Sequence, residues 1–143
     1  MSHAEVAVRP MAHAAAPTPA DPVAQAARQL ASAERRYEAG DFAGAVADYR
    51  RSLGARAGAP AFVGLARALY DSNPQNAAEA LRALDSAIKL EPGYAQAHLL
   101  VGVIHQDEGR TAQARAAYQR FLQLQPAGPQ AADVRQILAK QLK

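Results

Sequence analysis

Apolar and polar residues follow one another along this chain with the spacing of amphipathic helices. Large hydrophobic residues recur three or four positions apart, as Val134, Ile137 and Leu138 do near the C-terminus, and this is the period of one helix face. No segment alternates β-branched and polar residues as a half-buried strand would. The pattern predicts an all-α fold with helices over about 22–39, 42–54, 60–71, 77–90, 95–108, 112–124 and 130–142.

Three segments of the chain repeat the same helical pattern. Ala45, Ala80 and Ala114 are spaced by 35 and then 34 residues, and a fixed period in this range is typical of a solenoid of helical hairpins. We expect a right-handed α-solenoid of three helix-turn-helix hairpins, closed by a capping helix that covers the apolar face of the last hairpin. The expected repeats span about 22–58, 59–94 and 95–128, and the capping helix spans 129–143.

Short polar residues and glycines mark the expected helix ends. Gly40 and Gly109 suit the left-handed conformation of a helix C-terminus, and Pro22 suits the first position of a helix. Residues with a short oxygen-bearing side chain suit the N-terminal cap, where they accept from free backbone amides. The predicted N-terminal caps are Asp21, Asp41, Thr111 and a capping box of Asn76 with Glu79.

Residues 1–21 differ in composition from the repeats. They are rich in alanine and proline, including Pro10, Pro17 and Pro19, and they show no helical period. Such a segment cannot bury enough apolar surface to order itself. We expect a disordered tail or a linker, and we interpret 22–143 as a repeat module that is joined to, or cut from, something larger.

Composition and charge exclude several classes of function. The chain has no cysteine, which removes disulfides, thiolate metal sites and cysteine nucleophiles. The formal charge of +3 is too small to indicate nucleic-acid binding without clustered basic and aromatic residues. One local basic stretch is interrupted by acidic residues, so we interpret it as a solvated face; it contains Arg35, Arg36, Arg50, Arg51 and Arg56, with Glu34, Glu38 and Asp48 among them.

No apolar run approaches the length of a membrane span. The N-terminus also lacks the continuous apolar region of a signal peptide. We therefore expect no membrane insertion and a cytoplasmic location, and the preference for arginine over lysine fits a bacterial, GC-rich genome.

The repeats resemble the tetratricopeptide repeat, a helix-turn-helix of 34 residues. The resemblance rests on the segments 40–49 and 109–118, on a small residue early in each first helix, and on a proline that closes the second and third repeats. It covers about 23–126, plus the final helix to 142. The sequence departs from the family pattern in two places. The position near the start of the first helix, where the family usually has a bulky aromatic residue, holds Gln29, Phe62 and His98 in the three repeats, and the first repeat has no closing proline. The small residues are Ala33, Ala66 and Gly102, and the closing prolines are Pro92 and Pro126.

The resemblance implies a protein-protein interaction adaptor, or scaffold, that binds a peptide or a partner surface in its concave groove. That face is built mostly by the first helix of each hairpin, and helical phase places three residues of each such helix on it. Tyrosines there would supply contact area. For the aliphatic residues on this face, packing between hairpins is the alternative interpretation. The expected partner-binding residues are Leu30, Glu34, Tyr37, Val63, Arg67, Tyr70, Leu99, Val103 and Gln106.

One subgroup of the family reads C-terminal carboxylates with a cluster of Lys, Arg and Asn on this face. The matching positions here lack that cluster, so we do not expect recognition of an acidic, chaperone-type C-terminus. These positions hold Leu30, Glu34, Gly64, Gln96 and Leu100.

The sequence shows no chemistry of an enzyme. Its serines have no base at motif spacing, and no glycine-rich phosphate loop precedes a helix. His98 and His105 lie seven residues apart on one helix face, but we expect packing rather than a metal site there. The sequence predicts no catalytic residue, no cofactor and no metal.

Two alternatives to an adaptor stay open. Small bacterial secretion chaperones also resemble three tetratricopeptide repeats with a C-terminal helix at this length. A self-assembling structural scaffold, and thus a homo-oligomer, is the other alternative. It would use the N-terminal end of the array, where Gln29, Ser32 and Arg36 look like a poor packing set that is not strongly charged.

Overall fold

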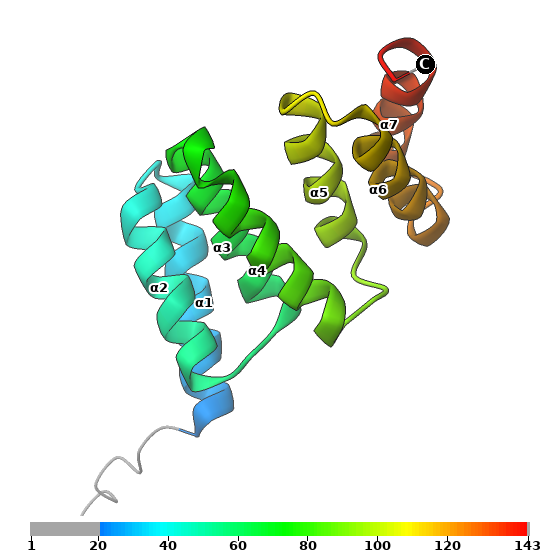
Figure 1. The fold of residues 1–143 in the computed structure, drawn as a ribbon. Coiled ribbons are helices and arrows are strands. Elements are labelled where there is room, and N and C mark those ends of the chain that lie inside the picture. Colours follow the sequence, from blue (N-terminus) through cyan, green and yellow to red (C-terminus); the bar gives the residue numbers. More distant parts are fainter. Residues whose placement is uncertain (1–20, 143) are drawn as a thin grey trace, which may run out of the picture.

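The computed structural model describes residues 21–142, which form a succession of antiparallel α-helices with no strand among them (Figure 1). The hairpins α1–α2, α3–α4 and α5–α6 follow one another, and α7 packs against α6. The prediction of an all-α solenoid of helical hairpins is confirmed. The helices are α1 (Pro22–Glu38), α2 (Phe42–Ala55), α3 (Ala59–Ser72), α4 (Ala77–Leu90), α5 (Ala95–Asp107), α6 (Thr111–Leu124) and α7 (Pro129–Lys140), with a 3₁₀ turn η1 (Pro74–Asn76) before α4. The predicted tail over 1–21 lies outside the described residues, except for Asp21.

The first helices of the hairpins form the inner layer of the array. Helix α3 contacts α1 on one side and α5 on the other, whereas α2, α4 and α6 each pack against their own hairpin partner and against the helix that follows them. Side chains on α1, α3 and α5 therefore share one face of the molecule, as a solenoid of hairpins requires.

Small residues allow the helices to approach closely. Gly102 of α5 lies against the ring of Tyr118 of α6, and a Cβ atom placed on this glycine would be 2.5 Å from Cδ1 of the ring. Gly64 of α3 makes a similar close approach to the ring of Tyr49 of α2. Ala33, with no exposed surface, holds the position equivalent to Gly102 in the first hairpin. The repeated small residues thus mark the sites where helix axes come closest.

The apolar core divides into two clusters. The larger cluster runs through α1–α5 and includes Leu69, Leu84 and Ile104. The smaller one joins α6 to α7, where Phe121 and Val134 are almost fully buried. The capping helix therefore covers an apolar face of the third hairpin, as predicted. Helix α7 ends two residues earlier than predicted, yet Leu142 beyond its end is still buried.

A buried carboxylate holds the first hairpin together. Asp48 of α2 is 3% exposed, and its Oδ2 accepts from Ser32 Oγ at 2.6 Å and pairs with Arg36 Nε at 2.9 Å. Its Oδ1 pairs with Arg51 Nη1 at 2.6 Å. The Ser32 hydrogen bond is the main cause that lowers the pKa of Asp48, which stays ionised.

The prediction that Ser32 and Arg36 form a poor packing set at the end of the array was wrong. Both side chains bind Asp48 within the hairpin, and Arg36 also pairs with Asp41 at 2.8 Å. The sequence pattern alone did not show that Asp48 is buried.

Two of the predicted caps form as expected. Asp21 accepts from the backbone amide of Val23 at 3.1 Å, and Asp41 accepts from that of Gly44 at 2.9 Å. Gly40 and Gly109 have positive φ angles of 81° and 75° just after α1 and α5, which glycine adopts without strain.

The other two predicted caps were wrong. Helix α6 begins at Thr111 itself, so Arg110 holds the cap position and no side chain caps the helix. The capping box of Asn76 with Glu79 does not form either, because the 3₁₀ turn leads directly into α4. The Asn76 side chain instead donates to the carbonyl of Leu69 at 3.0 Å, while Asn73 accepts from the amide of Gln75 at 2.9 Å.

Candidate functional site

The inner face of the array carries three adjoining hollows, with volumes of about 380, 190 and 230 Å³. The first and second share Arg67 and Gln96, and the second and third share Leu99, Val103 and Gln130. Neighbouring hollows share walls, so they follow one another in a row across α1, α3, α5 and α7; we call this row the groove. We call the first the N-terminal hollow and the other two the C-terminal hollows.

The N-terminal hollow is polar and aromatic. Glu34 and Glu38 reach it from α1, and Arg67 reaches it from α3. The guanidinium carbon of Arg67 lies 5.8 Å from the centre of the Tyr37 ring, within the range of a cation–π contact. The remaining walls are Tyr49, Pro60, Val63, Gly64, Tyr94 and Gln96.

The C-terminal hollows are mainly aliphatic. Leu99 and Val103 of α5 line both of them, and Ile137 of α7 closes the far side. These side chains are half-buried against the smaller core cluster, so each leaves part of its apolar surface open to the groove. The groove thus changes from charged and aromatic to aliphatic between α1 and α7.

Tyrosine hydroxyls in the N-terminal hollow fall into two groups. Tyr49 and Tyr94 line it, and within residues 21–142 no hydrogen bond to either hydroxyl is formed. Tyr37 also lines the hollow, but its hydroxyl donates to Asp71. Burial is the largest cause that raises the pKa of Tyr49 and Tyr94. All these phenols are therefore neutral at physiological pH.

Side chains at the end of each inner helix form a series of bonds between repeats. Tyr37 donates to Asp71 on the next inner helix, and Tyr70 donates to Asp107 at 2.8 Å. Gln106 then donates to Gln141, beyond α7, at 2.6 Å. We call these three contacts the inter-repeat bonds. They run along one edge of the groove and join each inner helix to the next.

Solved structures of several proteins have the same fold. The tetratricopeptide-repeat domain of Arabidopsis OM64 matches with a TM-score of 0.75 at 18% identity, over 84% of this chain and 98% of that one. The second such domain of human RPAP3, in complex with an HSP70 peptide, matches at 0.72 and 25% identity, over 84% and 99%. The first such domain of Spaghetti (RPAP3), bound to an HSP90 peptide, matches at 0.72 and 20%, over 82% and 96%. This chain has the tetratricopeptide-repeat fold. No protein-family profile and no curated protein sequence matches it.

In this tetratricopeptide-repeat array, the structure brings six of the nine predicted partner-binding residues into the groove. Four of them line the N-terminal hollow, and Val63 among these is only 4% exposed, so it mainly belongs to the core. Two line the C-terminal hollows. The four are Glu34, Tyr37, Val63 and Arg67, and the two are Leu99 and Val103.

The other three predicted residues lie outside these hollows. Leu30 lines a separate hollow of about 300 Å³ between α1 and the loop that joins α2 to α3. Tyr70 and Gln106 take part in the inter-repeat bonds, and Gln106 also accepts from the Tyr118 hydroxyl at 2.6 Å. Their polar groups thus have partners within the tetratricopeptide-repeat array itself.

Two groove residues were missed because they do not lie on an inner helix. Tyr49 belongs to α2, and it reaches the N-terminal hollow because Gly64 presents no side chain in its way. Tyr94 precedes α5, where the chain turns after Pro92 and Gly93. The signal for Tyr49 was present in the sequence, since a glycine on an inner helix leaves room for an aromatic ring from the neighbouring helix.

Other chemistry in residues 21–142 is sparse. No group of three or more His, Asp or Glu side chains there could hold a metal ion. His98 Nε2 lies 3.0 Å from the carbonyl of Pro92, and His105 Nδ1 is buried without a hydrogen-bond partner. In the same range, every helix is too short or too polar to cross a membrane.

Proposed function

We propose that this chain is an adaptor that binds a peptide or a partner segment along the groove of its inner face. The observation that carries the proposal is the continuity of the three hollows across α1, α3, α5 and α7. A continuous groove with polar groups at one end and aliphatic pockets at the other suits an extended segment or an amphipathic helix.

The fold supports this proposal. Two of the solved structures that share it, at 20% and 25% identity, hold a peptide from a larger protein. In this chain the groove residues are half-buried rings and aliphatic side chains beside a few polar ones. Such surfaces gain affinity from apolar contact and gain specificity from the polar groups.

The ligand of this groove differs from the acidic peptides of those structures. Glu34 stands at a position where carboxylate-reading members of the family need a cation or an amide, and it lines the N-terminal hollow. Leu30 and Gly64, at two further such positions, offer no donor side chain. A carboxylate-rich segment would meet like charge there, which disfavours it.

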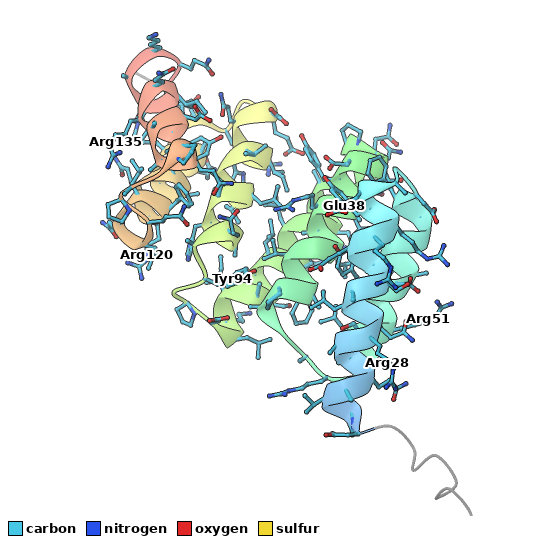
Figure 2. The ribbon with its side chains drawn as sticks, turned by 180° about the vertical axis from the view of Figure 1, so that it is seen from behind. Arg28, Glu38, Arg51, Tyr94, Arg120 and Arg135 are labelled. Carbon is cyan, nitrogen blue, oxygen red and sulfur yellow. The ribbon has the colours of Figure 1, made fainter. Side chains whose placement is uncertain are left out.

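Affinity capture from the host lysate tests the proposal, with the wild type beside Arg67→Ala and Arg28→Ala variants. Arg67 reaches both the N-terminal hollow and one C-terminal hollow, whereas Arg28 is an exposed arginine on the outer flank of α1 (Figure 2). We expect a partner that the wild type and Arg28→Ala capture in equal amounts and whose captured amount Arg67→Ala changes, read by mass spectrometry. A partner retained equally by all three proteins would place the interface outside the groove and contradict the proposal.

A further inference from the structure

We propose that the groove selects a basic partner segment, in which an arginine or lysine side chain enters the N-terminal hollow and an aliphatic side chain about five residues away enters a C-terminal hollow. This inference rests on the proposed function, because it names the chemistry of the partner that the same groove would bind.

An unpartnered hydroxyl points to a ligand in the N-terminal hollow. Tyr49 is 4% exposed, yet it lines the hollow and its hydroxyl makes no hydrogen bond within residues 21–142. The hydroxyls of Tyr37, Tyr70 and Tyr118 all donate to partners within the fold. Among the described residues, the buried side-chain atom without a partner is His105 Nδ1; the Tyr49 oxygen is instead open to the hollow, where it can accept from a donor that enters.

The charges around that hydroxyl favour a cation. Glu34 and Glu38 line the hollow, and the ion pairs of the described residues engage neither of them. Arg67, the cationic side chain in the lining, sits beside the Tyr37 ring. Two carboxylates and one guanidinium give the walls a formal charge of −1. A basic side chain would therefore gain two carboxylate partners and the Tyr49 oxygen together.

The formal charge of the N-terminal hollow is opposite in sign to that of the chain as a whole. The chain has a formal charge of +3. Figure 2 shows Arg28 and Arg51 on the side of α1 and α2, Arg120 and Arg135 on the side of α6 and α7, and Tyr94, which lines the N-terminal hollow, between them. The walls of that hollow, with two carboxylates and one guanidinium, are thus opposite in formal charge to the chain as a whole. Complementarity of this kind sets partner choice and speeds association.

The helix spacing sets the distance between the two side chains of the ligand. The N-terminal hollow lies over α1 and α3, and the C-terminal hollows lie over α5 and α7. Packed helices are about 8–10 Å apart, and an extended chain advances about 3.3–3.6 Å per residue. The two regions are two helix spacings apart, roughly 16–20 Å, so a basic residue and an aliphatic residue about five positions apart in an extended segment would reach them together.

Selection from a random peptide library displayed on phage tests the inference and does not require the natural partner to be identified first. The bait is the full chain, and a parallel selection uses the Glu34→Gln/Glu38→Gln variant. Glu34 and Glu38 are exposed and make no ion pair with the described residues, so replacing both carboxylates by amides should leave the fold intact. Asp85→Asn, which changes an exposed carboxylate on α4, is the matched control. We expect wild type and control to enrich peptides with a basic residue about five positions from an aliphatic one.

Affinities of the enriched peptides complete the test. The double Gln variant should bind them about tenfold more weakly, because two partly exposed ion pairs are lost, and Tyr49→Phe should weaken them severalfold. Circular dichroism checks that each variant is folded. Enrichment of acidic peptides, or equal binding by the double variant, would overturn the inference while the proposed function stands. Failure to enrich any peptide that Leu99→Ala weakens would count against the proposed function itself, because Leu99 lines both C-terminal hollows.

Discussion

The Tyr37 hydroxyl donates a hydrogen bond to the Asp71 carboxylate, 34 residues further along the chain. The same contact recurs one repeat later, where Tyr70 donates to Asp107 at 2.8 Å. The residues of each pair lie at the ends of neighbouring inner helices, so the bond links one hairpin to the next. The Tyr37 hydroxyl therefore has a structural role, whereas the Tyr37 ring faces the groove.

Removal of the Tyr37 hydroxyl should weaken the array without changing its shape. We expect Tyr37→Phe to lower the free energy of unfolding by about 1 kcal/mol, since a partly exposed hydrogen bond to a charged group is lost. Asp71→Asn and the double variant complete a double-mutant cycle, measured by urea denaturation. Additive effects of the two changes would show that the bond contributes nothing.

The same contacts predict that two tyrosines ionise at a higher pH than free tyrosine does. Burial, followed by the hydrogen bond to a carboxylate, raises the pKa of Tyr37 and of Tyr70 to about 12. Since the folded-state pKa exceeds the unfolded value of about 10, these phenols stabilise the fold fully below pH 10 and lose that contribution as the pH rises from 10 to 12. Ultraviolet difference absorbance should show a tyrosine fraction that ionises in this upper range. A single transition near pH 10 in the folded protein would contradict this prediction.

The helices and repeats were predictable because each depends on residues that are near in sequence. Amphipathic spacing fixed the helix positions, and alanine at corresponding positions fixed the period. The errors at Thr111 and Asn76 arose because a cap can be predicted only when the first residue of the helix is known to within one position. Hydrophobic spacing does not give that precision. The N-terminal end was misread because Asp48 is buried by α1, which lies far from it along the chain.

The groove was predicted only in part for a related reason. Helical phase places residues on a face of their own helix, so it correctly put Arg67 and Leu99 on the inner face. It cannot show that a side chain from the second helix passes a glycine to reach the same face, as Tyr49 does beside Gly64. Nor does it show which polar groups are already bonded within the fold, as the Tyr70 hydroxyl is.

Overpacking at the close approach of α5 and α6 should be costly. A methyl group added by Gly102→Ala would strike the Tyr118 ring, which has no exposed surface to move into. We expect a loss of about 1–3 kcal/mol in the free energy of unfolding, despite the better helix propensity of alanine. Gly54→Ala in α2 is the matched control, because nothing lies within 4 Å of the added methyl group. It should stabilise the protein by up to about 1 kcal/mol. Thermal denaturation measures both variants against the wild type. Equal shifts of the unfolding midpoint in Gly102→Ala and Gly54→Ala would contradict this prediction.

Asp48 should make the stability of the first hairpin depend on acid pH. Its hydrogen bond from Ser32 and its ion pairs with Arg36 and Arg51 hold its folded-state pKa below the ordinary value. A carboxyl group with a lowered pKa stabilises the fold above its unfolded pKa of about 4, and that contribution is lost as the pH falls through the folded-state value. Asp48→Asn should therefore lower the free energy of unfolding by about 2 kcal/mol at pH 7, and by less as the pH falls below 4.

An exposed carboxylate provides the control for Asp48. Asp133 on α7 is exposed and makes no ion pair with the residues that the structure describes, so Asp133→Asn should leave the pH dependence of stability unchanged. Urea denaturation at a series of pH values measures both variants against the wild type. If Asp48→Asn and wild type differed by the same free energy at pH 7 and at pH 3, the ionised carboxylate would not be what stabilises the hairpin. The loss would then come from packing or from the neutral hydrogen bond of Ser32, which has no reason to change over that pH range.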